Sequence, residues 1–192
     1  MTRPGAATDD LPHGRPRPGP AAVPPVLLLD VDGVLNAMAF DLPEGWHTGR
    51  FRGYTLSWDP SVTARLRGWH TDGRVELQWL TTWADNADLL LAEPMGLPRG
   101  LRVHRRDDGV GPTGFVGSWA GAPGWWKLTA ARAVVSDEPG RRVVWIDDDL
   151  ADQAGDTGEW LAANPQVFVV APALATGLTH AQLDEVERWL DS

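Results

Sequence analysis

Apolar residues occur along the chain in two patterns. In one, several apolar residues follow one another directly, which predicts a strand buried on both faces; in the other, they recur every three or four positions, which predicts an amphipathic helix. The two patterns alternate, and this order is typical of an α/β domain with a doubly wound, Rossmann-like, mostly parallel sheet and helices on both faces. The predicted strands cover residues 26–31, 75–80, about 101–106, 141–146 and 166–172, and the predicted helices cover 60–71, 84–94, 124–135 and 179–190.

Turn and cap signals lie at several of the predicted boundaries. In the Gly-rich, aromatic segment after the first strand, Gly53 is placed to turn a small β-hairpin. Asp59 followed by Pro60 is typical of an N-cap and the first position of a helix. Thr179 with Gln182 fits a capping box at the start of the last helix.

The composition is that of one globular domain preceded by a tail. Of the 192 residues, 43% are hydrophobic and 22% are charged, as in ordinary soluble domains. Residues 1–24 are rich in Pro, Gly and Arg and are expected to be disordered, so the predicted domain is 25–192. The net charge of −9 argues against a general nucleic-acid coat and against a binder of anionic membranes. Without cysteines, a transmembrane-length apolar stretch or a signal-peptide core, we expect a cytoplasmic protein that has no disulfides.

Polar residues follow the predicted strands at the points where these end. Two acids follow the first strand, two threonines the second, and an acid run the fourth: Asp30 and Asp32, Thr81 and Thr82, and Asp147, Asp148, Asp149 and Asp152. Ligands of an open parallel sheet bind outside the carboxyl ends of its strands, so these side chains meet there if the strands are neighbours. Clustered carboxylates without His or Cys favour Mg²⁺, and a threonine with a lysine, Lys127, suits a phosphate group. The set predicts phosphoryl transfer, in which an Asp can serve as nucleophile.

The order of these motifs resembles that of the haloacid dehalogenase (HAD) superfamily of aspartate-nucleophile phosphatases. Its four motifs are matched in order, between residues 26 and 152, by "LLLDVDGV", "LQWLT", "WWKLT" and "VVWIDDDLAD". More narrowly, "DVDGVLN" with "WLTTW" and "WIDDD" is similar to small HAD domains associated with RNA-repair proteins. The resemblance implies a Mg²⁺-dependent phosphatase that acts through an aspartyl-phosphate intermediate.

Carried over by position, the resemblance implies a role for each motif residue. Asp30 would be the nucleophile and a Mg²⁺ ligand, and Asp32 would be the general acid/base and contact the metal through its backbone carbonyl. Thr81, or Thr82 if the strand ends one residue later, and Lys127 would bind the transferring phosphate. Asp148 would be the third metal ligand, and the water molecules of the metal would be held by one of three further acids: Asp147, Asp149 or Asp152.

Two other classes of function share part of this pattern. A phospho-receiver signalling module also holds clustered Asp, a Thr and a Lys around Mg²⁺, but in receivers the Lys comes last, whereas here Lys127 precedes the acid run. A non-catalytic HAD-like binding module is the other class, and the intact acid set argues against it. Taken singly, each residue also has a structural interpretation, as a turn acid, a strand-end threonine or a solvated lysine.

The intervals between motifs leave no room for a large cap domain, which superfamily members that act on small metabolites usually carry. Only the hairpin around Gly53 and the Gly-rich loop 109–124 are expected to cover the site. An open site excludes water poorly unless the substrate fills its mouth or a second copy of the protein closes it. We therefore expect a phosphorylated macromolecule as substrate, a nucleic-acid end first and a phosphoprotein second, with a small metabolite as the remaining alternative.

Tryptophans and a basic run allow two interpretations each. Of the eleven tryptophans, four are expected in the core: Trp79, Trp145, Trp160 and Trp189. Six others are expected near the site, where they either stack on bases or pack under a long loop: Trp46, Trp58, Trp83, Trp119, Trp125 and Trp126. The basic run either follows a phosphate backbone or is a solvated face: Arg102, His104, Arg105 and Arg106.

Overall fold

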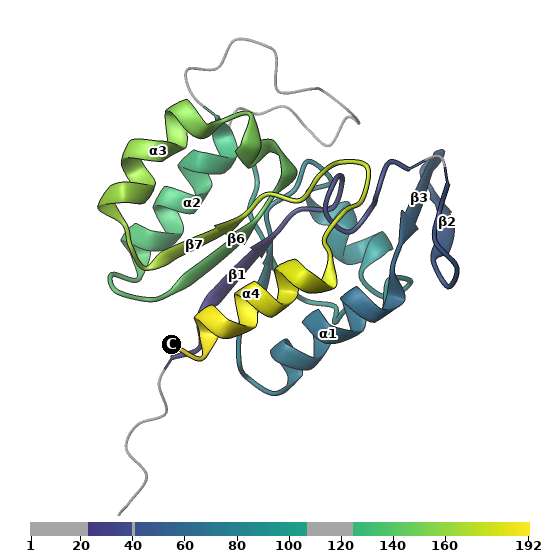
Figure 1. Ribbon diagram of the computed structural model, residues 1–192, viewed down its shortest axis with the longest axis horizontal. Coiled ribbons are helices and arrows are strands. Elements are labelled where there is room, and N and C mark those ends of the chain that lie inside the picture. Colours follow the sequence, from purple (N-terminus) through teal and green to yellow (C-terminus); the bar gives the residue numbers. More distant parts are fainter. Residues whose placement is uncertain (1–22, 40, 107–124) are drawn as a thin grey trace, which may run out of the picture.

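The computed structural model describes residues 23–39, 41–106 and 125–192 (Figure 1). Its main feature is a five-stranded sheet in the order β5-β4-β1-β6-β7, with every strand parallel to its neighbours. The strands are β1 (Val26–Leu29), β4 (Glu76–Trp79), β5 (Arg102–Val103), β6 (Val143–Ile146) and β7 (Val167–Val170). The predicted fold class is confirmed. The expected tail, apart from residues 23 and 24, and the loop 109–124 lie outside the described residues.

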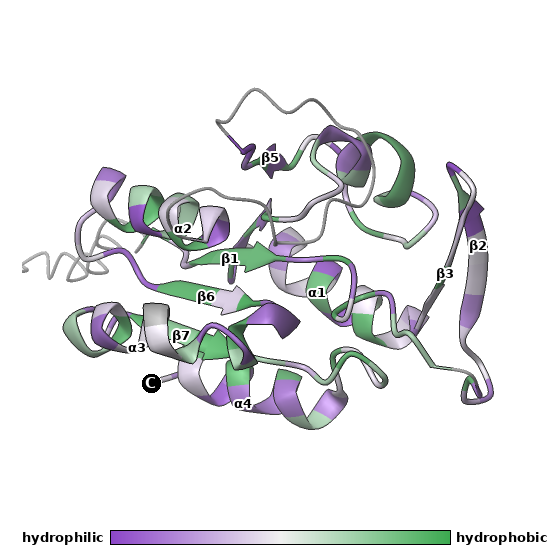
Figure 2. Cartoon of the chain, turned by 90° about the horizontal axis from the view of Figure 1, so that it is seen from above, coloured by the Kyte–Doolittle hydropathy of each residue, from purple (hydrophilic) through white to green (hydrophobic). Residues whose placement is uncertain are grey.

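Helices cover both faces of this sheet, as Figure 1 shows. On one face lie α1 (Pro60–Thr71) and α4 (His180–Leu190), and on the other lie α2 (Trp126–Asp137) and α3 (Ala154–Ala163). Side chains of β1 alternate between the two layers: Leu27 and Leu29 belong to the core cluster under α1 and α4, and Val26 and Leu28 to the cluster under α2. A strand buried on both faces has to be apolar throughout, and Figure 2 shows β1 and β6 as hydrophobic strands between helices of mixed polarity.

A small antiparallel hairpin stands apart from the sheet. It consists of β2 (His47–Phe51) and β3 (Tyr54–Trp58), and Gly53 adopts a φ of +90° in its turn, as predicted. The predicted caps are also present: the Asp59 side chain accepts from the amide of Ser61 at the start of α1, and Thr179 and Gln182 form a capping box at the start of α4. Among the described residues, no helix has the length and apolar character needed to span a membrane.

The segment 84–94 differs from the regular helix that its pattern predicts. Residues 85–91 are helical, but most of them form a π-helical turn, η1 (Ala87–Leu91), and Ala84 before it is in the left-handed region with a φ of +46°. The Asp88 carboxylate accepts hydrogen bonds at 3.0 Å from the amides of Gly100 and Leu101, which ties this turn to the segment leading into β5. π-Helical turns are uncommon and often lie at functional sites.

Tryptophans pack mainly within the two core clusters. Trp79 and Trp145 are fully buried, as predicted, and Trp160 and Trp189 are partly buried against the clusters. Of the six expected near the site, Trp58 and Trp125 are also buried; the Trp125 ring stacks on that of Trp145, with centroids 4.9 Å apart. Three more are half-buried: Trp46, Trp83 and Trp126. Trp119 lies outside the described residues.

Candidate active site

The predicted convergence of strand ends is present. β1 lies between β4 and β6, so the residues that follow these three strands share one edge of the sheet. Asp30 directly follows β1 and donates its amide to the Ile146 carbonyl at 3.1 Å. Asp147 directly follows β6, and Thr81 comes two residues after β4. The parallel register therefore brings together residues that are more than 100 positions apart in the chain.

Three carboxylates form the centre of this edge. Oxygen atoms of Asp30, Asp147 and Asp148 all lie within 4.8 Å of one another, and the first two residues are 4% and 0% exposed. Three oxygen-donating acids at this spacing, without His or Cys, are a donor set for a hard divalent cation such as Mg²⁺. The residues present thus fit the metal that the motifs imply. Asp147, one of the three acids considered for holding the metal's waters, lies in the trio itself, whereas Asp152 is exposed at the rim.

Lys127 is the positive group against which these acids are packed. It lies in the first turn of α2, is 1% exposed, and has its Nζ atom 2.5 Å from Asp30 Oδ2, 3.0 Å from Asp147 Oδ1 and 3.3 Å from Asp149 Oδ2. Burial lowers the pKa of Lys127, but the charges of the three acids outweigh it and raise that pKa above its ordinary value. Lys127 is therefore a fixed cation rather than a solvated helix lysine.

One ammonium does not neutralise four carboxylates, and the pKa values of the acids reflect the excess charge. Burial, with the charge of Asp30, raises the pKa of Asp147 well above its usual range, although Lys127 lowers it. Burial, with the charges of Asp30 and Asp149, raises the pKa of Asp148 to about 6. Raised carboxyl pKa values are expected in a metal-free site built from several carboxylates, because a bound divalent cation would favour their ionised forms.

The glycine after the two acids has a steric role. Gly33 adopts a φ of +70°, and a Cβ atom placed there would lie 2.2 Å from Cγ of Asp148. Only glycine permits this approach between the loop after β1 and the turn η2 (Asp148–Ala151) after β6. The Asp-x-Asp-Gly sequence thus supplies acids and also the space in which an acid from another strand stands beside them.

Asp32 is hydrogen-bonded to two residues to which the motifs assign no role, Asn36 and Trp83. Its Oδ1 accepts from Asn36 Nδ2 at 2.8 Å, and its Oδ2 accepts from Trp83 Nε1 at 2.9 Å. Asn36 Oδ1 in turn accepts from the amide of Ser57 on β3. Burial raises the pKa of Asp32, and the two hydrogen bonds partly offset this. The sequence signal for Asn36 is its place in "DVDGVLN", and Trp83, in "WLTTW", is one of the six tryptophans expected near the site.

The two threonines after β4 differ in accessibility. Thr81 is 1% exposed, and its hydroxyl accepts a hydrogen bond from the amide of Trp83 at 3.3 Å. Thr82 is exposed and borders the pocket that contains Asp30. The hydroxyl open to a ligand is therefore that of Thr82.

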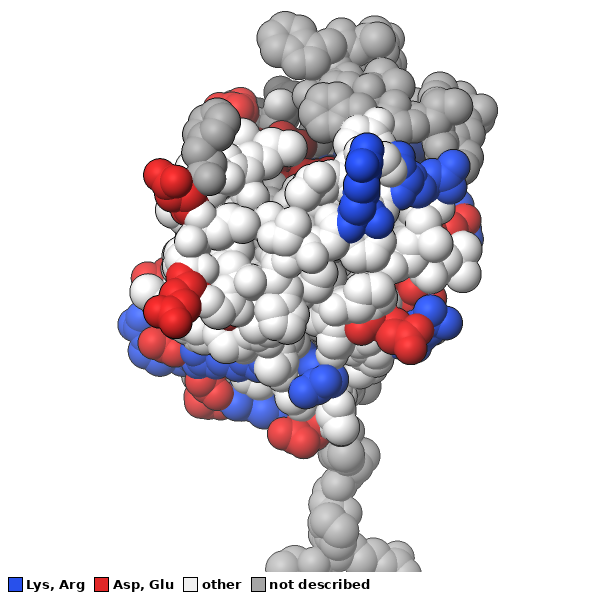
Figure 3. All heavy atoms as spheres, turned by 90° about the vertical axis from the view of Figure 1, so that its right-hand side faces the viewer, with Lys and Arg blue, Asp and Glu red and all other residues white. Residues whose placement is uncertain are grey.

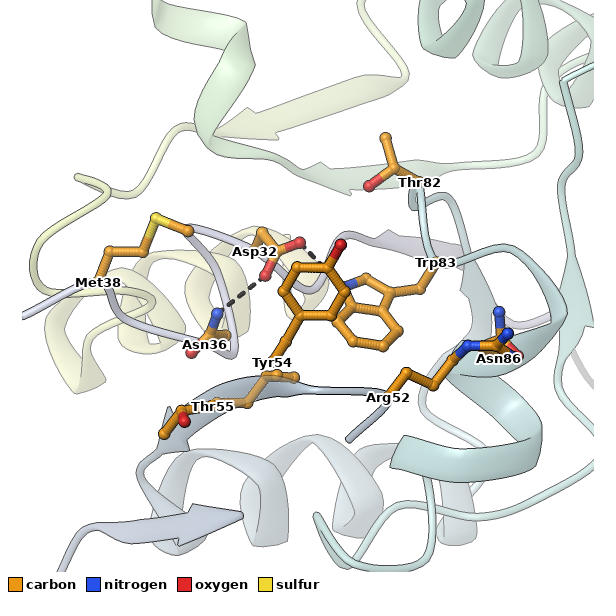
Figure 4. A pocket seen from close by; sticks show the side chains of 10 residues that line it. Asp32, Asn36, Met38, Arg52, Tyr54, Thr55, Thr82, Trp83 and Asn86 are labelled. Carbon is orange, nitrogen blue, oxygen red and sulfur yellow. Dashed lines mark hydrogen bonds between the residues drawn. The ribbon is translucent and has the colours of Figure 1, made fainter. Parts of the chain in front are cut away.

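Two adjoining hollows open onto these residues. We call the first the site pocket; it contains the acid cluster and is bordered by, among others, Asp30, Lys127, Asp148, Asp149, Arg106 and Trp126. We call the second the recess; it lies between the hairpin and the turn η1. Asp32, Met38 and Thr82 border both hollows, so Asp32 stands at their junction (Figure 4).

The basic run is not a continuous cationic stripe. Arg105 forms a two-pronged ion pair with Asp85, at 2.6 and 3.2 Å, and Arg102 lies 3.9 Å from Asp137. His104 bonds to Gln78 at 2.7 Å, and burial lowers its pKa to about 4, so it is neutral at pH 7. Arg106 borders the site pocket. Figure 3 shows that the hairpin side of the molecule is mostly uncharged, with acidic and basic side chains next to each other along its lower edge.

Comparison with known proteins yields one match, to a family. Residues 26–183 match the model of the HAD domain in Swiss Army Knife RNA repair proteins. No curated protein and no solved structure matches the chain. The matched span includes the strands β1, β4, β6 and β7, both acid motifs, Lys127 and the recess. The chain therefore belongs to the family of HAD domains found in Swiss Army Knife RNA repair proteins.

Proposed function

We propose that this domain is a Mg²⁺-dependent phosphatase that removes a terminal phosphate from a nucleic-acid end through an aspartyl-phosphate intermediate. The observation that carries the proposal is the position of Asp30. Its carboxylate is buried, lies in the acid trio and is fixed from both sides, with Oδ1 accepting from the amide of Val31 at 2.7 Å and Oδ2 bound by Lys127 at 2.5 Å. A nucleophile held in one orientation beside a fixed cation suits attack on a phosphate group.

In the first step, an oxygen of Asp30 attacks phosphorus and the bond from phosphorus to the ester oxygen breaks. The leaving oxygen takes a proton from Asp32, which stands at the junction of the two hollows and whose raised pKa favours the protonated form that this step needs. In the second step, Asp32 accepts a proton from water and the water oxygen attacks phosphorus. The bond from phosphorus to the Asp30 oxygen breaks, and inorganic phosphate is released.

The surrounding residues bind and orient the phosphate. Lys127 and the Thr82 hydroxyl offer donors to its oxygens, and Lys127 also offsets the charge of Asp30. Asp30, Asp147 and Asp148 would hold Mg²⁺, which when bound adds positive charge at the transferring group. Asp149 contacts Lys127 and would keep that ammonium in place.

A nucleic-acid end is the favoured substrate because the family consists of HAD domains in RNA repair proteins and because Arg106 borders the site pocket. The net charge of −9 opposes binding to a long stretch of nucleic acid, but it does not oppose binding of one end at a cationic point. A phosphoprotein remains the second candidate.

The test is hydrolysis of an aryl phosphate with and without Mg²⁺, by the wild type and by Asp30→Asn. We expect turnover that depends on Mg²⁺ and is lost in Asp30→Asn, because the amide cannot attack. Asp184→Asn, a change of the same kind on the exposed surface of α4, is the matched control and should keep full activity. Normal turnover by a folded Asp30→Asn would refute the mechanism, and a stable phosphoprotein without turnover would indicate a receiver-like module instead.

Substrate class is tested separately. We expect kcat/KM to be higher for a 3′- or 5′-phosphorylated oligonucleotide than for a phosphopeptide or a mononucleotide. A preference for the phosphopeptide would reassign the domain to protein substrates.

A further inference from the structure

The recess has the size of a single ring system. Its volume is about 120 Å³, close to that of an engineered protein cavity of about 150 Å³ that takes up one benzene molecule. It borders the site pocket through Asp32, so one substrate molecule can reach both the recess and Asp30. The recess is thus placed to hold the part of the substrate on the leaving side of the phosphate.

The walls of the recess are aromatic and apolar near Asp32. Tyr54 and Trp83 meet edge to face, with ring centroids 5.8 Å apart and an angle of 78° between the planes. Tyr54 is 44% exposed and Met38 is 46% exposed, so both keep apolar surface available to a ligand. Figure 4 shows the Tyr54 ring and the Trp83 indole together beside Asp32. Flat aromatic surface of this kind stacks on nucleobases without regard to their identity.

The far end of the recess is polar and is joined to the hairpin turn. Arg52 Nη1 donates to Asn86 Oδ1 at 3.2 Å, which links the hairpin to the residue before η1. Arg52 has a φ of +49°, next to Gly53 at +90°. A two-residue turn of this kind favours Asn, Asp or Gly at its first central position, so an arginine is there in spite of backbone strain. The guanidinium and amide groups at this end suit the polar edge of a base.

From these walls, we propose that the recess binds the unpaired base of the terminal nucleotide of the substrate, stacked against Tyr54. The inference rests on the proposed function, and it adds that the domain selects ends whose last base is free. A recess with room for one ring system cannot also admit the pairing partner of that base. With the phosphate at Asp30 and the leaving oxygen at Asp32, the base would occupy the only remaining hollow of the two that Asp32 borders.

The experiment compares three oligonucleotides with the same terminal phosphate: one with a single-stranded end, one with a blunt duplex end, and one whose terminal nucleotide is abasic. For the wild type, we expect kcat/KM to be higher for the single-stranded end than for the blunt duplex end. It should also exceed that for the abasic end by roughly 5- to 150-fold, which corresponds to the 1–3 kcal/mol typical of stacking per base. The difference should lie mainly in KM. In Tyr54→Ala this ratio should fall close to one, and in Tyr54→Phe, which keeps the ring, it should return to the wild-type value.

A matched control is Leu89→Ala, which removes an exposed apolar side chain from η1 outside the recess and should leave the ratio unchanged. Equal kcat/KM for base-containing and abasic ends, or equal ratios in the wild type and Tyr54→Ala, would overturn the inference while leaving the phosphatase proposal intact. The inference would also be overturned if Tyr54→Ala lowered the turnover of a phosphotyrosyl peptide but not the turnover of the oligonucleotide. If the wild type has no phosphatase activity at all, the affinities of the labelled oligonucleotides are measured by fluorescence anisotropy. Equal affinity for base-containing and abasic ends would overturn the inference. Tighter binding of the base-containing end, lost in Tyr54→Ala, would support it.

Discussion

Two groups of charged side chains in this domain each combine basic and acidic residues. One group is exposed on the surface, and the other is buried. The surface network joins α1 and α4 through Arg65 and Arg74, which pair with three acids at 2.5–2.6 Å: Asp184, Glu187 and Asp191. The buried cluster at the carboxyl edge of the sheet has a single cation, Lys127, whose side chain is 2% exposed. Side chains of the surface network are 23–65% exposed.

The pKa values of the acids differ in sign between the two groups. Hydrogen bonds from Arg74 and Arg65 lower the pKa of Glu187, so folding favours its ionised form. Burial and the charge of Asp30 raise the pKa of Asp148 to about 6, so folding of the metal-free protein opposes its ionised form. The surface network is thus a modest contribution to stability, whereas the buried cluster costs stability until a cation balances it. Such a cost is expected at a functional site.

The largest effect should come from Asp32, which borders the cluster without pairing with Lys127. Asp32→Asn should fold normally and bind Mg²⁺, but kcat should fall by about 10²- to 10⁴-fold because the amide cannot transfer a proton. Steady-state kinetics on an aryl phosphate measure this, with a metal-binding titration to show that the site is intact. If Asp32→Asn matched the wild type, the proton would have to come from another group.

Removal of the single cation should give the largest change in stability. Lys127→Met leaves the acids without their partner, and breaking a buried ion pair in this way typically costs about 3–5 kcal/mol. Urea unfolding at pH 8 without metal measures the loss. Arg74→Met in the surface network is the matched control, and it should cost no more than about 1 kcal/mol because its partners remain solvated. Equal losses in the two variants would mean that burial does not distinguish the two groups.

Sequence patterns predict the fold well because most of its determinants are local. The apolar runs at β1, β4, β6 and β7, the turn at Gly53 and the two caps each depend on neighbouring residues. The acids meet at one edge because β1 lies between β4 and β6, an order that the sequence analysis stated only as a condition. The π-helical turn is an exception, because the hydrogen bonds that the Asp88 carboxylate accepts from a segment twelve residues away leave no periodic signal in the sequence.

Site residues are predictable only as far as a motif names them. The partners of Asp32 come from a loop four residues on and from a turn 51 residues on, and neither contact follows from periodicity. Likewise, the closeness of Gly33 to Asp148 depends on how two loops pack, so the sequence shows a glycine but not its reason. The recess needs the hairpin to be placed against the residues before η1, which is a tertiary contact of Arg52 with Asn86 and of Tyr54 with Trp83.

The pH dependence of metal binding sharpens the comparison further. Mg²⁺ displaces protons from its ligands, and the pKa of Asp148 is raised to about 6 in the metal-free protein. Affinity should therefore fall as the pH is lowered through 6, by about tenfold per pH unit for each proton displaced. Calorimetric titration with Mg²⁺ between pH 5 and 8 measures this. An affinity independent of pH across that range would show that the Asp148 carboxylate is already ionised at pH 5. Asp148 would then not be one of the acids whose pKa the cluster raises.

The smallest effects should be opposite in sign. Glu187→Gln removes a carboxylate that the fold favours, so at pH 7 it should lower the free energy of unfolding by about 0.2–1 kcal/mol and leave activity unchanged. This loss is present above the ordinary carboxyl pKa of 4.5 and disappears as the pH falls through the lowered pKa of Glu187. Asp148→Asn removes a carboxylate that the metal-free fold disfavours, so at pH 8 it should raise the free energy of unfolding, by about 1 kcal/mol once solvent screening is allowed for.

That gain should vanish as the pH falls from 6 toward the ordinary value of 3.8, because Asp148 then becomes protonated in the wild type as well. Saturating Mg²⁺ should reverse the order, since the wild type gains stability by binding the ion and Asp148→Asn has lost a ligand. Thermal unfolding of the wild type, Glu187→Gln and Asp148→Asn is measured with and without Mg²⁺. Each variant is then compared with the wild type under both conditions. A loss of stability in metal-free Asp148→Asn at pH 8 would place Asp148 with the surface network, among the acids that stabilise the fold.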